Sequence, residues 1–170
     1  MSWKYKVFLV VFTVIVALDQ WTKHLVHTKF YWGESIPIID SFFALTYVRN
    51  SGAAFGILHR APATFRDPFF IIVPILVLLI ITVIFVRLTQ AQRLSAFALS
   101  LIYAGAIGNL IDRLRFKYVI DFLDFHWKEV YHWPAFNVAD SSIVVGVGFL
   151  LLESFFSGKS KVSMDNKQVA

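Results

Sequence analysis

The stretch Phe69–Val86 reads FFIIVPILVLLIITVIFV and contains no charged residue. A helix needs about 20 consecutive apolar residues to cross a bilayer, so this stretch predicts a transmembrane helix. Working outward, the apolar segments Tyr5–Lys23, Leu94–Ile111 and Val138–Phe156 predict three more. The chain is 58% hydrophobic and 16% charged, whereas soluble domains are about 45–50% apolar and about 25% charged. We therefore expect an all-α membrane protein with four transmembrane helices.

An even number of spans places both chain ends on one side of the membrane. Basic residues are denser in the terminal segments and the short second loop than in the two long loops, which favours cytoplasmic termini. The two long loops then lie outside. In the first of them the aromatic and β-branched run Phe42–Val48 precedes the turn residues Arg49–Gly52. This pattern predicts a small β-rich extracytoplasmic segment between helices 1 and 2.

Length and composition bound the remaining organisation. We expect a single four-span domain of residues 1–156, followed by a polar, disordered cytoplasmic tail of residues 157–170. The net charge of +5 suits basic residues at membrane faces, and without a basic stripe on a soluble fold no nucleic-acid partner is expected. The absence of cysteine excludes disulfides, thiolate catalysis and cysteine–zinc sites.

The notable polar clusters all fall at the predicted outer ends of the spans. A charged residue at the centre of a membrane helix costs about 2.5–3.5 kcal/mol, so such residues usually mark a functional site. In chain order these residues are Asp19, Lys23, Asn109, Asp112, Arg113, Asp121, Asn137 and Asp140. Their gathering on one face of the membrane predicts a site there.

Asp121 and Asp140 suggest paired-carboxylate chemistry. Two aspartates that face one cavity couple their titrations, so that the pair holds one proton. The ionised member takes a proton from water, while the protonated member donates to a carbonyl oxygen as that oxygen becomes anionic. This is the chemistry of aspartic proteases, and it requires no metal, no cofactor and no nucleophilic side chain.

Structural roles are open for the same residues. Asp124 is the main rival of Asp121 because it lies only three residues further along the chain. The other structural alternatives are an ion pair between Asp19 and Lys23, a helix cap formed by Asn137 and Asp140, and a local salt bridge between Asp112 and Arg113.

Other functions find less support in the sequence. His24 and His27 have no third zinc ligand at a diagnostic spacing, and Ser141 and Ser142 lack a nucleophile elbow. A small proton-linked transporter is the main alternative function, but the long uncharged stretches of the spans leave no polar path through the membrane. A scaffold whose polar residues only cap helices is a second alternative.

Five short motifs in this order resemble the lipoprotein signal peptidase (signal peptidase II) family. The motifs are Asp19–Lys23, Arg49–Gly56, Gly105–Arg113, Val119–Phe122 and Phe136–Ser141. Each motif alone is a weak signal, but their order and the four spans between them make a strong one. The resemblance covers nearly the whole chain.

The resemblance implies a bacterial inner-membrane aspartyl endopeptidase whose active site faces outward. Its substrates would be diacylglyceryl-modified prolipoproteins, cut just before the lipid-modified cysteine beside membrane lipid, and globomycin would block it. The catalytic pair would be Asp121 and Asp140. The supporting residues would be Asp19, Asn50, Asn109, Asp112, Arg113 and Asn137, to which we add Lys23 and Gly52 from the same motifs.

Overall fold

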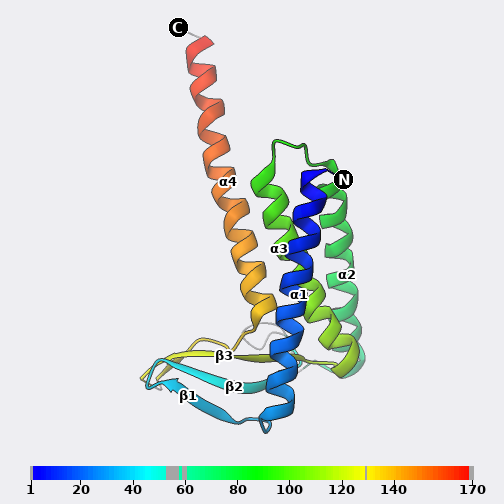
Figure 1. The fold of residues 1–170 in the computed structure, drawn as a ribbon, viewed down its shortest axis with the longest axis vertical. Helices are drawn as coiled ribbons and strands as arrows, with labels where there is room; N and C mark the ends of the chain where they lie inside the picture. Colours follow the sequence, from blue (N-terminus) through cyan, green and yellow to red (C-terminus); the bar gives the residue numbers. More distant parts are fainter. Residues whose placement is uncertain (1, 53–57, 59–60, 129, 169–170) are drawn as a thin grey trace.

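The computed structural model describes residues 2–52, 58, 61–128 and 130–168; for residues 132 and 157–168 it describes the backbone alone. Within this part of the chain, long helices form a bundle and short strands form a sheet across one end of it (Figure 1). The elements are α1 (Trp3–Lys29), β1 (Ser35–Ile39), β2 (Phe43–Asn50), α2 (Ala63–Arg87), α3 (Arg93–Phe116), β3 (Val119–Trp127), β4 (Tyr131–His132) and α4 (Val138–Gln168).

All four helices are long and apolar enough to cross a membrane, which confirms the predicted fold class. Helix α3 is the central one and packs against α1, α2 and α4. Small residues allow this close approach: a Cβ added to Gly146 of α4 would lie 2.7 Å from the carbonyl oxygen of Ala98 in α3. The sequence predicts this packing, because Ser100, Ala104 and Gly108 on the third span and Ser142 and Gly146 on the fourth recur every four positions and allow close backbone approach. The contacts between α3 and α4 confirm it.

The antiparallel sheet has the strand order β1-β2-β3-β4. Strands β1 and β2 come from the first long loop, as expected, but β3 and β4 come from the loop between α3 and α4. The prediction placed β structure only between helices 1 and 2, but Asp121, between α3 and α4, lies in β3 opposite Val48. The segment Val119–Phe122 is buried throughout, so it lacks the apolar–polar alternation that reveals a half-exposed strand.

The sheet packs against the end of α1. Val26 of that helix contacts a buried cluster that contains Tyr47, Ile120 and Phe122. Helix α1 consequently continues to Lys29, beyond the predicted end of the first span at Lys23. Asp19 and Lys23 therefore lie within a helix and are fully buried.

The chain termini lie at the end of the bundle opposite the sheet (Figure 1). The apolar part of α4 is Val138–Phe156, but its backbone stays helical to Gln168, where the sequence analysis predicts disorder from residue 157. No proline interrupts the polar residues 157–168, so a helix that is already formed can continue through them. The boundary between a peptidase domain and a cytoplasmic tail stays a prediction.

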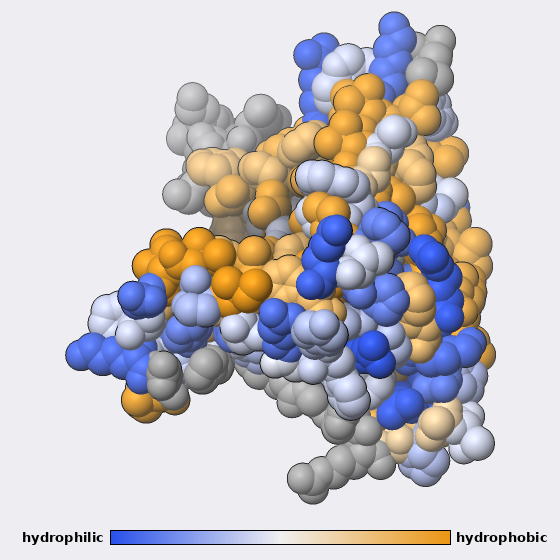
Figure 2. All heavy atoms as spheres, turned by 60° about the horizontal axis from the view of Figure 1, so that its bottom comes forward, coloured by the Kyte–Doolittle hydropathy of each residue, from blue (hydrophilic) through white to orange (hydrophobic). Residues whose placement is uncertain are grey.

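The sheet projects sideways from the bundle and carries apolar surface (Figure 2). Strand β1 leaves Ile36, Ile38 and Ile39 exposed. Further exposed aromatic residues in the sheet and its connecting segments are Tyr31, Trp32, Phe42, Trp127, Tyr131 and Trp133.

Candidate active site

Asp121 and Asp140 line the same cavity, which has a volume of about 640 Å³. Asp121 is held by strand β3 and Asp140 by the first turn of α4. The other polar residues of the cavity wall are Asn50, Asn109, Arg113 and Ser141. The apolar wall is formed by Val119, Trp133, Pro134, Ala135, Phe136, Ile143, Val144 and Val145.

The carboxyl group of Asp121 is almost completely buried, with 2% of the residue exposed. The side-chain amide of Asn137 donates to its Oδ1 at 2.7 Å, and that of Asn50 donates to its Oδ2 at 2.9 Å. Burial raises the pKa of Asp121 to about 7, and the nearby charge of Asp140 adds to this rise. Asp121 can therefore hold a proton near neutral pH.

Asp140 is part of the helix cap that the sequence analysis raised as an alternative. Its backbone N–H donates to Asn137 Oδ1 at 2.9 Å, and the backbone N–H of Asn137 donates to Asp140 Oδ2 at 3.2 Å. The other carboxylate oxygen, Oδ1, accepts a hydrogen bond from Asn109 Nδ2 at 2.7 Å. The side chain of Asp140 thus caps α4 and lines the cavity at the same time.

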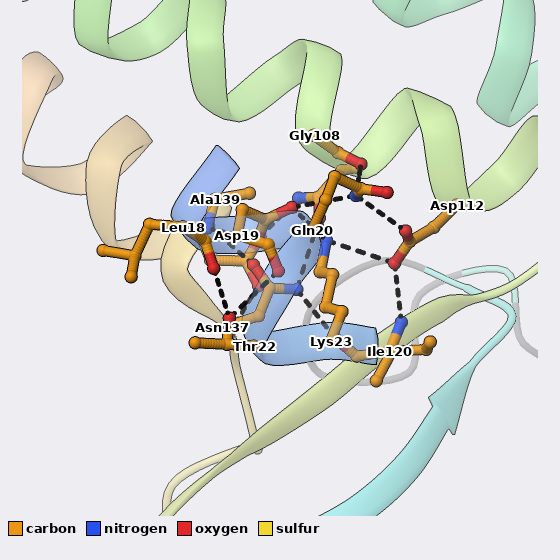
Figure 3. A network of polar contacts seen from close by, with 12 residues as sticks. Leu18, Asp19, Gln20, Thr22, Lys23, Gly108, Asp112, Ile120, Asn137 and Ala139 are labelled. Carbon is orange, nitrogen blue, oxygen red and sulfur yellow. Dashed lines mark hydrogen bonds and ion pairs between the residues drawn. The ribbon is translucent and has the colours of Figure 1, made fainter. Parts of the chain in front are cut away.

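A second polar cluster is centred on Lys23 (Figure 3). Lys23 Nζ lies 2.9 Å from Asp19 Oδ2 and 3.1 Å from Asp112 Oδ2. It also donates to Asn109 Oδ1 at 2.9 Å, which links this cluster to the cavity. The predicted ion pair between Asp19 and Lys23 is therefore present, but it is buried inside the bundle.

The two carboxylates of this cluster also bind backbone from other elements. Asp19 Oδ1 accepts the N–H of Ala139 in α4 at 2.9 Å, and Asp112 Oδ2 accepts the N–H of Ile120 in β3 at 3.1 Å. These bonds position the backbone beside each catalytic candidate, because Ala139 precedes Asp140 and Ile120 precedes Asp121.

Gln20 is a member of this cluster that the site prediction missed. Its amide donates to the carbonyl oxygen of Gly108 and to Asp112 Oδ1, each at 3.1 Å, and to Asp19 Oδ2 at 3.2 Å. The sequence feature that could have identified Gln20 is its position between an aspartate and an aromatic residue at the polar end of the first span.

A local salt bridge between Asp112 and Arg113 was one of the structural alternatives, but Arg113 does not form it. Asp112 pairs with Lys23 instead, and Arg113 points to the cavity, where its guanidinium donates to the carbonyl oxygen of Gly52 at 3.2 Å. The same guanidinium lies 4.9 Å from the ring centroid of Phe70 in α2. Gly52 N–H donates in turn to Asn50 Oδ1 at 3.0 Å, so Arg113 holds the segment that carries Asn50.

Asp124, the rival of Asp121, lies elsewhere on the sheet. It is not among the residues that line the cavity, and its Oδ1 is 3.9 Å from His126 Nδ1. Successive side chains of a strand point to opposite faces, so Asp124, three positions after Asp121, lies on the other face of the strand from Asp121.

The remaining candidates have structural partners. His27 Nδ1 lies 2.5 Å from the hydroxyl of Tyr47, and the hydroxyls of Ser141 and Ser142 donate to main-chain carbonyl groups, those of Asn137 and Leu101 at 2.9 and 3.2 Å. Positions 53–56 of the motif Arg49–Gly56 lie outside the described residues.

Comparisons with known proteins identify the family and the fold of the chain. A family profile described as signal peptidase (SPase) II matches residues 11–156. A protein of Geobacter sulfurreducens named lipoprotein signal peptidase is 51% identical over 149 residues, 88% of this chain and 91% of the relative. One of the same name from Syntrophotalea carbinolica is 48% identical over 155 residues, 91% of this chain and 94% of the relative. A solved structure described as a bacterial membrane enzyme superposes with a TM-score of 0.81 at 34% identity, covering 91% of this chain and 90% of that one.

Proposed function

The chain belongs to the signal peptidase II family, and from this premise we propose that Asp121 and Asp140 are its catalytic aspartates. Family membership makes the protein an aspartic peptidase, and the four long apolar helices make it a multi-pass membrane enzyme. The observation that supports the assignment most directly is that both carboxyl groups line one cavity while Asn137 contacts each of them.

The substrates in this proposal are prolipoproteins whose cysteine already carries a diacylglyceryl group, and the enzyme cuts just before that cysteine. The relatives' shared name, lipoprotein signal peptidase, supports the substrate class. The cavity supports the lipid requirement, since its apolar wall includes Val144 and Val145, which are also exposed on the outer surface of α4. The acyl chains can therefore stay among membrane lipids during cleavage.

The proposed location is the bacterial inner membrane, with the cavity at its outer face and both termini in the cytoplasm. Three features support this orientation: both termini lie opposite the sheet, basic residues are dense in the cytoplasmic segments, and aromatic residues are exposed around the sheet (Figure 1). The scissile bond of a membrane-inserted signal peptide lies at this same surface. Residues 1–156 then form the peptidase domain and residues 157–170 the cytoplasmic tail.

The two aspartates take different roles in this proposal because their surroundings differ. Asp121 is the acid and carries the shared proton, because burial and the charge of Asp140 raise its pKa to about 7. Asp140, in the first turn of α4, is the base, and its carboxylate oxygens are held in place by N–H groups from Asn109 and Asn137.

Cleavage then proceeds by general acid–base catalysis. Asp140 removes a proton from a water molecule as the water oxygen attacks the scissile carbonyl carbon, and Asp121 donates its proton to the carbonyl oxygen. The tetrahedral intermediate collapses when the cysteine nitrogen accepts the proton held by Asp140, the C–N bond breaks, and a hydroxyl proton of the intermediate returns to Asp121. Signal peptide and lipid-modified protein leave, and the pair again holds one proton.

The deciding experiment measures release of the signal peptide from a diacylglyceryl-modified prolipoprotein by the purified enzyme in lipid. Asp121→Asn and Asp140→Asn should each abolish release while thermal unfolding shows a folded protein. Asp124→Asn is the matched control and should cleave normally, because Asp124 lies outside the cavity wall. Normal turnover by either Asp121→Asn or Asp140→Asn would contradict the proposal.

Two inhibitors add independent checks. Globomycin should block cleavage by occupying the cavity, and EDTA should leave the rate unchanged, because the mechanism uses no metal. A rate that falls in EDTA and recovers with added zinc would contradict the aspartate mechanism.

A further inference from the structure

The orientation of the Asn109 side chain depends on a lysine that does not line the cavity. We propose that Lys23 is a positioning residue for Asp140: it fixes the amide of Asn109 so that the NH₂ group faces Asp140. The inference rests on the proposed catalytic role of Asp140, and it assigns Lys23 a function beyond neutralising buried carboxylates.

Hydrogen-bonding chemistry determines which way the amide points. An ammonium group donates hydrogen bonds and cannot accept them, so the 2.9 Å contact from Lys23 Nζ requires the oxygen of Asn109 on that side. Asn137 Nδ2 donates to the same oxygen at 3.2 Å. The nitrogen of the Asn109 amide must then face Asp140 Oδ1, which lies 2.7 Å away.

The reverse orientation would be unfavourable at three contacts. The NH₂ group would face two donors, Lys23 and Asn137, and the amide oxygen would face the carboxylate of Asp140. Asp140 Oδ1 would lose its hydrogen bond from Asn109 and would face a repulsive oxygen instead. The position of the Asp140 carboxylate in the cavity therefore depends on the orientation of Asn109.

Lys23 is itself rigidly held (Figure 3). It is 1% exposed and is paired with Asp19 on its own helix and with Asp112 on α3. The two carboxylates hold the ammonium group in place and leave it one direction in which to donate to Asn109. Because Lys23 is absent from the cavity wall, it acts through its partners, and among these Asn109 is the one whose side chain contacts Asp140.

The test must separate positioning from folding, because Lys23→Met alone would leave two buried carboxylates unpaired. The variant Lys23→Met with Asp112→Asn keeps the formal charge of the cluster at minus one, as in the parent enzyme. Asp112→Asn alone, in which the formal charge is zero, is the control for the loss of the Asp112 carboxylate. Relative to this control, kcat should fall about 10- to 100-fold. KM should change by less than about twofold, since the cavity wall is unaltered.

A double-mutant cycle tests the route through Asn109. In an Asn109→Ala background, adding Lys23→Met to Asp112→Asn should cause no further loss of the single-turnover rate. Additive losses, or an unchanged kcat in the charge-matched variant, would overturn the inference. Asp140→Asn is measured alongside: an active Asp140→Asn enzyme would overturn the proposed function itself, whereas an inactive one with a fully active Lys23 variant overturns only the positioning role.

Discussion

Gly108 lies so close to Asp19 that a Cβ at position 108 would be 2.6 Å from Asp19 Oδ2. The same Cβ would be 3.2 Å from the Cβ of Ala139. Helices α1, α3 and α4 therefore meet at this point with no space for a methyl group. The contact lets Asp19 reach the backbone N–H of Ala139, one residue before Asp140.

Gly108→Ala should destabilise the protein by about 1–3 kcal/mol, because overpacking at a closed site forces the helices apart. It should also lower cleavage by displacing Asp19 from Ala139. Gly148→Ala in α4 is the matched control, since a Cβ there would have no neighbour within 4 Å. That change should be neutral or stabilising by up to about 1 kcal/mol. Denaturant unfolding in lipid micelles measures both, and equal effects would refute the packing argument.

The activity should fall as the pH rises through about 7, because Asp121 must be protonated to act as the acid and its pKa is raised to about that value. The measurement is the pH dependence of kcat with a lipid-modified substrate. A rate that stays constant from pH 6 to pH 9 would contradict the assignment of the proton to Asp121.

The stability should follow the same titration. A raised pKa means that the folded protein binds the proton of Asp121 more tightly than the unfolded chain does. This contribution is complete below the ordinary aspartate value of 3.8 and is lost as the pH rises to about 7. Asp121→Asn, which cannot ionise, should reduce this dependence on pH in thermal unfolding, whereas Asp124→Asn should retain it.

Arg113→Ala should lower kcat/KM by about tenfold or more, because the segment that carries Asn50 loses its anchor at Gly52. Asp112 should remain satisfied in this variant, since its counter-charge is Lys23. The control is Arg115→Ala, which removes an exposed arginine two residues away. Cleavage assays on both variants measure kcat/KM. An equal fall in kcat/KM for the two variants would mean that the lost positive charge, and not the contact with Gly52, causes the effect.

Lys4→Met should destabilise the protein by about 1–3 kcal/mol without altering the activity of the folded enzyme. Lys4 is buried, and its ammonium donates to the carbonyl oxygens of Phe85, Val86 and Leu88 at 3.3, 2.8 and 2.7 Å. These groups lie at the carboxyl end of α2, where helix carbonyls lack partners of their own. The exposed Lys6 supplies the control, and thermal unfolding of Lys6→Met should match the parent.

Sequence reasoning succeeded where the deciding property is local. A bilayer demands about 20 apolar residues in a row and internally satisfied backbone, so the four spans can be read from the chain alone. Small residues spaced four apart on the third and fourth spans likewise predicted their close packing. The gathering of polar residues at one end of the spans indicated where the site lies.

The partner of each polar group depended on contacts between distant residues. The sequence contains Lys23, Asn109 and Asp112, but Lys23 is separated from Asn109 by 86 positions in the chain. Only folding brings Lys23 into contact with Asn109 and Asp112. Strand β3 escaped prediction because its first half, Val119–Phe122, is buried on both faces. A salt bridge between Asp112 and Arg113 was raised as an alternative because the two residues are adjacent in the chain. The sequence by itself determined the spans and the residues available for chemistry. The tertiary structure decided which of them meet, because a hydrogen bond in a dry interior depends on direction and distance between elements that hydropathy cannot encode.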